Sequence, residues 1–450
     1  MKTKSVKSAK GRTTATILAG DHIGRSLEVP GDKSISHRVA ILSALSGGTS
    51  QITGYLQCED CIHTLRGLEK LGVSSCIDED GELSISGTGG SFHAPSDALY
   101  LGNSGTGLRL LAGVAAGLPM SVELGGDESL NSRPMRRISA PLEAMGAEFE
   151  WLEADGCAPM RITGGNLKAI EYEMPVASAQ VKSCILLASM FTDGVTRVTE
   201  PRATRDHTER LLRVLEVPVE VKGLTIECTG LGREFPELEP QKWFVPGDFS
   251  SAAFWMAAVA AQESRRLTVQ NVGLNPRRTA LLDVLGRMGA EVTVEQISDP
   301  ADVEPYGDVK VSGQLLRGTD VSGDEIPNLI DELPLVAVLG ALAEGETVIR
   351  DAAELRVKES DRISCVVKNL KKMNVDVSET EDGMIVRGGN EIKPSATLQS
   401  YGDHRIAMAM AILALSSKEP VTIKDIACTE TSYPGFWYEL HHQGAHVEFR

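Results

Sequence analysis

Hydrophobic and polar residues are arranged along this chain in a pattern that returns six times. Each copy contains a leucine, two or three further residues, an apolar residue in most copies, and then glycine or a substitute directly before a strand. The leucines are Leu68, Leu142, Leu212, Leu285, Leu370 and Leu440, spaced by 74, 70, 73, 85 and 70 residues. Glycine or asparagine after the last apolar residue is typical of a helix end. The spacing therefore predicts six related structural units.

A second helix in each copy is rich in alanine, serine and glycine. These helices are expected to begin near Ser34, Gly105, Ser178, Phe249, Asp331 and His404. A short β-rich run separates the two helices, and a hairpin follows the leucine helix, most clearly at 73–85 and 375–386, where Asp-Gly marks the turn. Each unit is thus predicted as β-α-β-α-β-β over about 70 residues. We expect the small-residue helices to be buried and the leucine helices to face outward.

The two ends of the pattern indicate how the units are grouped. The sixth unit lacks its last strand, and an unassigned strand at 14–18 precedes the first unit, so we infer that this strand completes the sixth. The turn Pro-Gly-Asp occurs before unit one and again before unit four. The sequence therefore predicts one lobe over 30–245 and another that joins 1–29 to 246–450, with crossings near 30 and 246. Closure of the lobes over a cleft follows as a hypothesis.

Composition narrows the class of protein. The chain has 450 residues, of which 42% are hydrophobic but only 4% aromatic, while 44 are glycine. Small residues favour closely packed helices over an aromatic-filled barrel. The net charge of −17 argues against general binding to nucleic acid or to an anionic membrane. An anionic ligand would therefore require a locally basic site.

Cysteines and apolar runs indicate the compartment. Only Cys58 and Cys61 of the eight cysteines are closely spaced, and no second pair completes a zinc site, so we expect no metal. Residues 1–12 are basic and polar, without an apolar signal-peptide core after them, and are expected to form a mobile tail. No apolar run is long enough to span a bilayer. We expect a reduced, cytoplasmic protein without a membrane partner.

The stretch 30–38, Pro-Gly-Asp-Lys-Ser-Ile-Ser-His-Arg, carries the first chemical signal. A Pro-Gly turn ends a short strand, and a helix begins near Ser34. Ser34 and Arg38 are four residues apart and share a helix face, while Lys33 lies at the helix N-terminus. Free amides, a hydroxyl, an ammonium and a guanidinium together predict a site for phosphate or carboxylate. A capped helix with solvated charges is the alternative.

Similar clusters recur in the first half of the chain. The glycine-rich stretch 101–109 opens a helix but lacks the ending of a nucleotide P-loop. The stretch 131–137 places three arginines at a predicted helix start, where the helix dipole disfavours cations. Two further polar clusters lie at 178–183 and 204–209, and we place Lys182 at the start of the helix there. Each cluster alone is also consistent with a solvated helix face.

The second half adds carboxylates to the basic residues. Asp331 precedes an apolar helix, where it is either an N-cap or a functional acid. Lys358 and Arg362 are four residues apart with Glu359 between them, which resembles a preorganised acid/base cluster, although charge runs are most often solvated. The stretch 403–405, Asp-His-Arg, opens the last small-residue helix.

Seven of these stretches, in this order, resemble the 5-enolpyruvylshikimate-3-phosphate (EPSP) synthase family. They are 30–38, 102–109, 133–137, 177–183, 204–209, 356–362 and 403–409. The resemblance spans nearly all of the chain. It implies an α/β fold, the two-lobed inside-out α/β barrel of the enolpyruvyl transferases, with six β-α-β-α-β-β repeats, three per lobe, and an active site in the cleft between lobes.

The resemblance also implies a reaction. The family transfers the enolpyruvyl group of phosphoenolpyruvate to the 5-hydroxyl of shikimate 3-phosphate and releases phosphate, a step of the shikimate pathway toward chorismate and the aromatic amino acids. Addition at C2 requires protonation of C3 while the hydroxyl attacks, and elimination reverses that proton transfer. Such chemistry calls for positioned acids and bases and for no cofactor. The expected partners are the two small-molecule substrates, and we expect a monomer.

Site residues follow from the matching positions. The resemblance implies that shikimate 3-phosphate is bound by Lys33, Ser34, Arg38, Ser178, Ala179, Gln180, Arg205, Asp331 and Lys358. It implies that phosphoenolpyruvate is bound by Lys33, Asn103, Ser104, Gly105, Arg133, Gln180, Arg362, His404 and Arg405. Asp331 is expected to take the 5-hydroxyl proton. Lys33 and Glu359 are the expected partners in protonating and deprotonating the methylene carbon.

One position departs from the common family pattern. Many members carry a lysine three residues before the proline of the C-terminal segment, where this chain has Thr431 before Pro434. Together with the variants at 177–183 and 356–362, this resembles the group called class II, some of whose members resist glyphosate. Resistant examples have alanine where this chain has Gly105, so the response to glyphosate stays open.

Two other functions are alternatives to EPSP synthesis. A sister enolpyruvyl transferase acts on UDP-N-acetylglucosamine and shares the fold and the donor, but neither Cys58 nor Cys157 lies in the context of its reactive cysteine. A catalytically silent anion-binding protein is the second alternative. Binding alone would not require the acid/base set of Lys33, Asp331 and Glu359.

Overall fold

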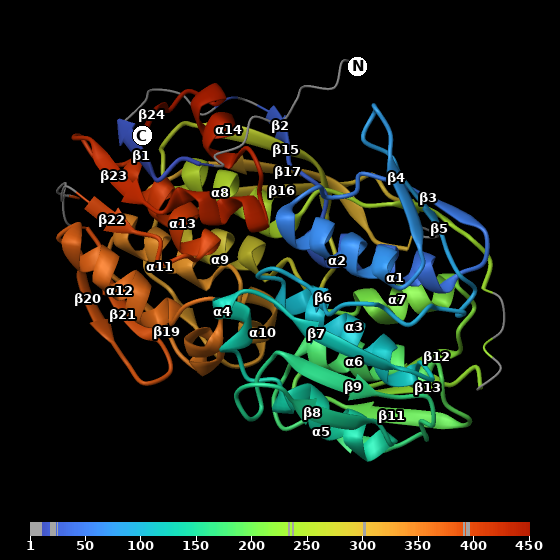
Figure 1. The fold of residues 1–450 in the computed structure, drawn as a ribbon. Helices are drawn as coiled ribbons and strands as arrows, with labels where there is room; N and C mark the ends of the chain where they lie inside the picture. The colour runs from blue at the N-terminus through green and yellow to red at the C-terminus, as the bar shows by residue number, and fades with distance from the viewer. Residues whose placement is uncertain are drawn as a thin grey trace. The chain divides into compact units, whose positions relative to one another are not determined.

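A computed structural model describes residues 11–18, 24, 26–232, 235, 238–299, 303–389, 392 and 397–450. The stretch 1–12, expected to be a mobile tail, lies almost entirely outside the described residues. The chain divides into two compact units (Figure 1). Unit 1 is Gly31–Val245, and unit 2 joins the described residues up to Pro30 to Pro246–Arg450.

Unit 1 contains three four-stranded sheets among its described residues, ordered β14-β3-β5-β4, β6-β7-β9-β8 and β10-β11-β13-β12. Its strands are β3 (Thr49–Thr53), β4 (Ser74–Ile77), β5 (Leu83–Ser86), β6 (Leu99–Tyr100), β7 (Ser121–Gly125), β8 (Glu148–Trp151), β9 (Met160–Thr163), β10 (Glu171–Glu173), β11 (Val195–Thr199), β12 (Val219–Lys222), β13 (Thr225–Thr229) and β14 (Lys242–Phe244). Its helices are α1 (Lys33–Leu45), α2 (Glu59–Lys70), α3 (Gly105–Gly117), α4 (Glu128–Asn131), α5 (Arg136–Met145), α6 (Ala179–Ser189) and α7 (His207–Val214).

Unit 2 also contains three four-stranded sheets among its described residues, ordered β16-β17-β15-β2, β18-β19-β21-β20 and β22-β23-β1-β24. Its strands are β1 (Thr14–Leu18), β2 (Ser26–Glu28), β15 (Arg266–Gly273), β16 (Glu291–Gln296), β17 (Tyr306–Ser312), β18 (Asp320–Val321), β19 (Glu346–Ile349), β20 (Asp376–Glu379), β21 (Met384–Arg387), β22 (Thr397–Gln399), β23 (Val421–Lys424) and β24 (His446–Phe449). Its helices are α8 (Phe249–Ala260), α9 (Ala280–Met288), α10 (Ile326–Leu329), α11 (Leu333–Leu342), α12 (Arg362–Lys372), α13 (His404–Ala414) and α14 (Phe436–His442), with the 3₁₀ turns η1 (Gly323–Glu325), η2 (Ala353–Val357) and η3 (Ile426–Thr431).

All six sheets have the same internal pattern. One edge pair is parallel, as in β14 with β3 and β6 with β7, and the other neighbours are antiparallel. The small-residue helices α1, α3, α6, α8, α11 and α13 are buried along nearly their whole length, whereas the leucine helices bury one face. The predicted fold, six β-α-β-α-β-β repeats with three in each half of the molecule, is confirmed.

Positive backbone φ angles explain the glycine, or its substitute, at the end of each leucine helix. The residue at this point has φ 98° at Gly72, 115° at Gly146, 59° at Glu216, 105° at Gly289, 62° at Asn374 and 113° at Gly444. A left-handed residue ends a helix and turns the chain into the next strand. Glycine adopts this conformation without a steric penalty, and asparagine tolerates it better than most residues. Glycine or its substitute therefore recurs in the sequence because the backbone requires a left-handed residue at this point.

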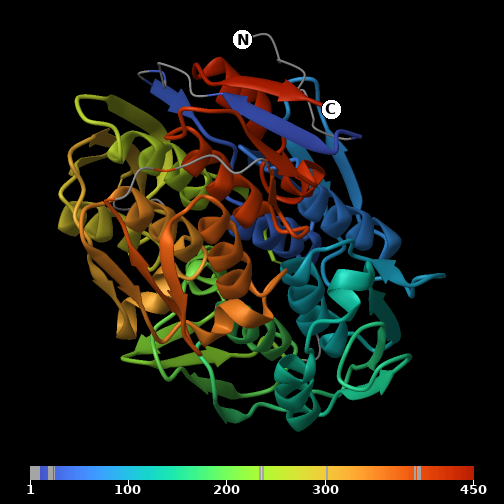
Figure 2. The same ribbon diagram turned by 90° about the vertical axis from the view of Figure 1, so that its left-hand side faces the viewer.

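Strands distant in sequence complete three of the sheets. β1 lies between β23 and β24 and is antiparallel to both, with Thr16 opposite Thr422 on one side and Glu448 on the other. Figure 2 shows this dark-blue strand against red strands from the C-terminal end. β2 and β14, which precede the two crossings between units, add parallel edge strands beside β15 and β3. The first sheet of each unit thus depends on a strand from outside its own repeat.

At three charged stretches the backbone is less regular than the sequence pattern suggests. Asp331 is not the N-cap of α11, because this helix begins at Leu333 and Glu332 occupies the cap position. Lys358 and Arg362 do not share a helix face, since η2 ends at Val357 and Asp361 caps a new helix by accepting from the Ser364 amide. Arg133 precedes α5 and does not open it. Tight turns at these places put the charged side chains on irregular backbone, which helical periodicity does not describe.

No helix in the described ranges combines the length and the apolar character needed to cross a membrane.

Close contact between α3 and α6 is set by Gly113. A Cβ atom built on Gly113 would lie 2.3 Å from the carbonyl oxygen of Cys184 in α6. Backbone atoms cannot move away as the end of a flexible side chain can. The glycine therefore fixes how closely the two helices approach.

We predict that Gly113→Ala lowers the free energy of unfolding by about 1–3 kcal/mol, the usual effect of overpacking a core. The matched control is Gly286→Ala in α9, where an added Cβ meets nothing within 4 Å. This control should be neutral or stabilise by up to about 1 kcal/mol, because alanine favours helix over glycine. Thermal and urea unfolding of both variants check the pair, and equal stability of the two would contradict the packing argument.

Candidate functional site

The N-terminus of α1 carries the first predicted site residues. Asp32 caps this helix by accepting from the Ile35 amide at 2.9 Å, and Lys33 is its first residue. The Lys33 Nζ lies 3.0 Å from Asp60 Oδ2 in α2, and both side chains are largely buried. Asp60 was not found by sequence reasoning, because it lies in a different motif 27 residues away. It holds the Lys33 ammonium against α2.

Arg38, on the next turn of α1, is buried and bound on three sides. Its Nη1 donates to the Ser34 carbonyl, its Nε to Thr208 Oγ1 and its Nη2 to Ser183 Oγ, each at 2.8 Å. Thr208 belongs to α7 and Ser183 to α6. The guanidinium thus links the predicted shikimate 3-phosphate residues of α1 to two other helices. Ser183 and Thr208 lie within the stretches 177–183 and 204–209, but the sequence alone assigned neither of them a role.

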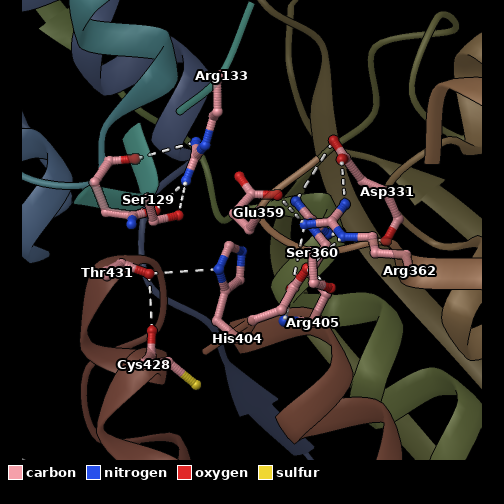
Figure 3. A network of polar contacts seen from close by, with 12 residues as sticks. Ser129, Arg133, Asp331, Glu359, Ser360, Arg362, His404, Arg405, Cys428 and Thr431 are labelled. Atoms are coloured by element: carbon pink, nitrogen blue, oxygen red, sulfur yellow. Dashed lines mark hydrogen bonds and ion pairs between the residues drawn. The ribbon is translucent and has the colours of Figure 1, made fainter. Parts of the chain in front are cut away.

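The turn before α3 is held by Arg133. Its Nη2 donates to Asn103 Oδ1 at 2.5 Å and to Ser129 Oγ at 3.2 Å, and its Nη1 donates to the Asn103 carbonyl at 3.3 Å. Figure 3 shows Arg133 with Ser129. Ser104 caps α3 by accepting from the Gly107 amide. Three of the predicted phosphoenolpyruvate residues, Asn103, Ser104 and Arg133, therefore lie around one helix N-terminus.

Gln180 connects the N-terminal turns of α6 and α3. Its Oε1 accepts from Arg109 Nη1 and its Nε2 donates to Thr106 Oγ1, both at 2.7 Å. A Cβ on Gly105 would lie 2.9 Å from Arg109 Nη1 and 3.1 Å from Arg133 Nη1. Glycine at this position leaves the space beside both guanidinium groups open.

Three further predicted residues lie near the N-termini of α6 and α7. Ser178 caps α6 by accepting from the Val181 amide at 3.4 Å, and Ala179 is the first helical residue. Arg205 is half-buried in the turn before α7. The structure thus places the predicted residues of unit 1 at the starts of α1, α3, α6 and α7.

Lys182 differs from its predicted place. It is buried inside unit 1, where its Nζ lies 3.0 Å from Glu200 Oε2 and 2.7 Å from Glu209 Oε1. Buried charges need such partners, since an unpaired ammonium in a protein interior is strongly unfavourable. Lys182 therefore joins α6 to the segment that carries Arg205. Its ammonium is not available to a ligand at the N-terminus of α6.

In unit 2, Asp331 lies among three arginines, of which Figure 3 shows Arg362 and Arg405. Its Oδ1 is 3.4 Å from Arg362 Nη1, and its Oδ2 is 3.5 Å from both Arg278 Nη1 and Arg405 Nη2. Arg405 Nη1 also donates to the Asp331 carbonyl at 3.2 Å. The sequence alone assigned no role to Arg278, because its motif, Asn-Pro-Arg-Arg, is not one of the seven stretches that resemble the EPSP synthase family.

Arg362 is the first residue of α12 and joins three carboxylates. Its Nε donates to Asp403 Oδ2 at 2.8 Å and its Nη2 to Glu359 Oε2 at 2.5 Å, in addition to its contact with Asp331. Burial lowers the pKa of the Arg362 guanidinium, but Asp403, Glu359 and Asp331 outweigh it and the net pKa is raised. Arg362 therefore stays protonated at any physiological pH. Two predicted acid/base residues, Asp331 and Glu359, meet on this one cation.

Lys358 lies on the short loop between η2 and α12. Burial lowers the pKa of its ammonium, Asp331 opposes the shift, and Arg362 lowers the pKa further. Arg356 anchors the loop by donating to the carbonyls of Glu381 at 2.7 Å and Thr380 at 2.6 Å. The loop thus presents a lysine that gives up its proton more readily than one in water.

His404 and Thr431 contact each other in unit 2. The Thr431 hydroxyl lies 3.4 Å from His404 Nδ1 and donates to the Cys428 carbonyl at 2.8 Å (Figure 3). Thr431 stands where many family members carry lysine, so this chain places a neutral hydroxyl there. His404, predicted to bind phosphoenolpyruvate, contacts η3, whereas Arg405 next to it contacts Asp331.

The described residues contain no group of three or more His, Cys, Asp or Glu side chains suited to a metal ion. The sites that the structure does contain are cationic: helix N-termini with Lys33, Arg38, Arg109 and Arg133 in unit 1, and the arginines around Asp331 in unit 2. Forked guanidinium donors and helix amides are suited to phosphate and carboxylate groups.

His37 is a buried residue of unit 1 that the sequence reading passed over. Its Nδ1 lies 2.8 Å from Thr64 Oγ1 in α2, and its Nε2 lies 3.4 Å from Ser104 Oγ at the start of α3. Burial, Lys33 and Arg38 all lower the pKa of this imidazole well below its ordinary value. His37 therefore stays neutral in the folded protein and links α1 to two neighbouring helices.

Comparison with known proteins gives a consistent result. A family model described as EPSP synthase (3-phosphoshikimate 1-carboxyvinyltransferase) matches residues 18–440. A protein of Akkermansia muciniphila named 3-phosphoshikimate 1-carboxyvinyltransferase is 49% identical over 424 residues, which cover 92% of this chain and 96% of that protein. A protein of the same name from Desulforamulus reducens is 46% identical over 412 residues, covering 91% and 95%.

Solved structures agree with the sequence relatives. EPSP synthase from Acinetobacter baumannii matches with a TM-score of 0.84 and 41% identity, covering 97% of this chain and 100% of that one. The enolpyruvyl transferase NikO from Streptomyces tendae has a TM-score of 0.79 at 18% identity, covering 98% and 99%. The second match shows the shared fold alone.

We predict that His37 makes stability fall in mild acid. In the unfolded chain this histidine binds a proton near pH 6.5, whereas in the folded chain it resists protonation. The stability present above about pH 6.5 is therefore lost as the pH falls toward the lower folded pKa. The loss is at most about 1.4 kcal/mol per pH unit. Urea unfolding of wild type and His37→Gln at pH 7 and pH 5.5 checks this. The variant should lose less stability between the two pH values, and the exposed His442→Gln should behave as wild type. Equal pH dependence in all three proteins would contradict the assignment.

Proposed function

This chain belongs to the EPSP synthase family, and we propose that it catalyses the reaction for which the family is named. In that reaction the enolpyruvyl group of phosphoenolpyruvate passes to the 5-hydroxyl of shikimate 3-phosphate, and inorganic phosphate is released. Both substrates carry a phosphate and a carboxylate. They are therefore suited to the cationic groups that this acidic chain concentrates at a few helix N-termini.

The observation that carries the proposal is the setting of Asp331. Its carboxylate lies among three guanidinium groups, and Arg362 joins it to Glu359. Binding anions requires only the cations, whereas a carboxylate kept ionised among them supplies a base. That combination supports a reaction in which a hydroxyl is deprotonated next to bound anions.

We assign the proton transfers as follows. Asp331 accepts the proton of the 5-hydroxyl as its oxygen bonds to C2 of phosphoenolpyruvate, and C3 gains a proton to become a methyl group. Elimination then breaks the bond between C2 and the phosphate oxygen while the methyl group loses a proton. Lys33 and Glu359 are the proposed proton donor and acceptor at C3. Lys33 is held by Asp60 and Glu359 by Arg362, so both are oriented before substrate binds.

The remaining residues are proposed to bind the substrates. Ser34, Arg38, Ser178, Ala179, Gln180, Arg205 and Lys358 join Lys33 and Asp331 in binding shikimate 3-phosphate. Asn103, Ser104, Gly105, Arg133, Gln180, Arg362, His404 and Arg405 join Lys33 in binding phosphoenolpyruvate. We further propose that the enzyme works as a monomer in the cytoplasm. All eight cysteines are free thiols, in keeping with a reducing compartment.

The acceptor decides between this function and its alternatives. We expect phosphate release from phosphoenolpyruvate with shikimate 3-phosphate and none with UDP-N-acetylglucosamine. A continuous phosphate assay with each acceptor in turn measures this. Release with the nucleotide sugar would favour the sister transferase. Release with neither acceptor, from protein with a normal circular dichroism spectrum, would favour a silent binding protein.

The role of Asp331 is tested by Asp331→Asn and Asp331→Ala. Loss of a general base should lower kcat by about 10²–10⁴-fold, while the protein stays folded. The matched control is Asp320→Asn, which removes an exposed carboxylate paired with Arg350 and should leave kcat unchanged. Steady-state kinetics, with binding of shikimate 3-phosphate measured by calorimetry, checks both. An Asp331 variant with near-normal kcat would remove this residue from its proposed role.

A further inference from the structure

We infer that Arg278 is the positioning residue for Asp331, holding its carboxylate oriented and ionised while substrate is bound. The inference deepens the proposed function and rests on it, because it takes Asp331 as the base and Arg362 and Arg405 as ligands of phosphoenolpyruvate. Arg278 contacts Asp331, Ser250 and Asp248, and of these three residues Asp331 is the one assigned to a substrate. Its effect on the reaction would therefore pass through that carboxylate.

Arg278 is held in place by buried contacts on two sides. It lies in the turn between β15 and α9, and its side chain is only 3% exposed. Its Nη1 is 3.5 Å from Asp331 Oδ2, while its Nη2 donates to Ser250 Oγ at 2.9 Å and lies 3.7 Å from Asp248 Oδ1. One edge of the guanidinium thus faces the start of α8 and the other faces Asp331.

The start of α8 is itself rigid. Asp248 caps this helix by accepting from the Ser251 amide at 2.9 Å, and Ser250 donates to Glu332, the residue after Asp331. Every residue of α8 is buried. A shift of the Arg278 guanidinium would disturb the cap of a fully buried helix, so its orientation is set by the fold. This gives the second Pro-Gly-Asp turn a role parallel to the first, where Asp32 caps α1 beside Lys33.

The other two arginines cannot serve Asp331 and substrate equally. In the proposed function Arg362 and Arg405 direct donors at the phosphate and carboxylate of phosphoenolpyruvate, and a given N–H cannot point two ways. Without a neighbouring cation the pKa of Asp331 would rise, and the protonated acid is no base. Lys358, a further cation that interacts with Asp331, is proposed to bind shikimate 3-phosphate, so Arg278 is the cation beside Asp331 with no proposed substrate to bind. Its 3.5 Å separation exceeds the roughly 2.7–2.9 Å of a tight charge-assisted hydrogen bond, so the carboxylate keeps oxygen lone pairs for the hydroxyl proton.

The test compares Arg278→Gln, Arg278→Lys and the control Arg287→Gln, which removes an arginine paired with Glu325 at the surface. We expect Arg278→Gln to lower kcat about 10–100-fold, with KM for phosphoenolpyruvate changed less than about threefold. The apparent pKa of the acid limb of kcat should rise by about one unit, because a cation beside a carboxylate lowers its pKa by that order. Arg278→Lys keeps the charge and should restore the acid limb. Arg287→Gln should match wild type throughout.

A purely structural role would lower activity without moving the acid limb, and that outcome, or a kcat within about twofold of wild type, would overturn the inference. Should Arg278→Gln fail to fold, Ser250→Ala decides, since it removes one hydrogen bond to Arg278 and should move the acid limb in the same direction.

Wild-type enzyme without turnover would instead refute the proposed function. Carbon-13 NMR of labelled aspartate, with Asp331→Asn to assign the signal, then still tests Arg278 by whether the Asp331 pKa rises in Arg278→Gln. An unchanged pKa there would overturn the inference independently of activity.

Discussion

Burial of the small-residue helices is the constraint on which the rest of this structure depends. Helices α8 and α13 are buried along their whole length, and α1, α3 and α6 nearly so. A buried helix leaves its first amides without intrahelical partners, and a side-chain cap satisfies one of them in every small-residue helix except α11, which carries Pro334 in its first turn. Asp32, Ser104, Ser178, Asp248 and Asp403 supply these caps. The same requirement that completes the core therefore gathers polar groups at the helix N-termini.

Exposure within the unit 1 helices follows this constraint. In α1 the residues that are not buried are Lys33 and Ser34, in α3 Thr106, and in α6 Ala179 and Gln180. All lie in the first two positions of their helices. Packing thus leaves accessible just the turn where backbone amides and the helix dipole favour an anion. Lys33, Ser34, Ala179 and Gln180 among these accessible residues are predicted to bind substrate.

Polar contacts orient the predicted site residues within each unit. Lys33 is paired with Asp60, Arg133 with the Asn103 turn, and the unit 2 arginines with Asp331, Glu359 and Asp403. Buried cations left unpaired would shift their pKa or disrupt the fold. The carboxylates hold the cations in place, and in the proposed function a phosphate or carboxylate of a substrate would exchange for some of these contacts. Such preorganisation lowers the ordering entropy that binding must overcome.

The sequence by itself determined the repeat, the fold class and the helices that carry the site. The glycine signals were readable because a left-handed residue is required at each helix end, from Gly72 to Gly444. The polar groups at the helix N-termini could be predicted because each group lies within a short run of neighbouring residues. These are local requirements, and a local pattern in the sequence records them. Family membership followed from the same motifs in their order.

Only the tertiary structure decided which charges meet. Asp60 lies 27 residues from Lys33, Thr208 lies 170 from Arg38, and Arg278 lies 53 from Asp331. The sequence places Lys182 at a helix N-terminus, yet its ammonium is buried and paired with two glutamates distant in sequence. Lys358 and Arg362 are only four residues apart in sequence, yet irregular backbone separates them. Which charges pair depends on how helices pack across the core. The spacing of residues within one motif carries no information about that packing.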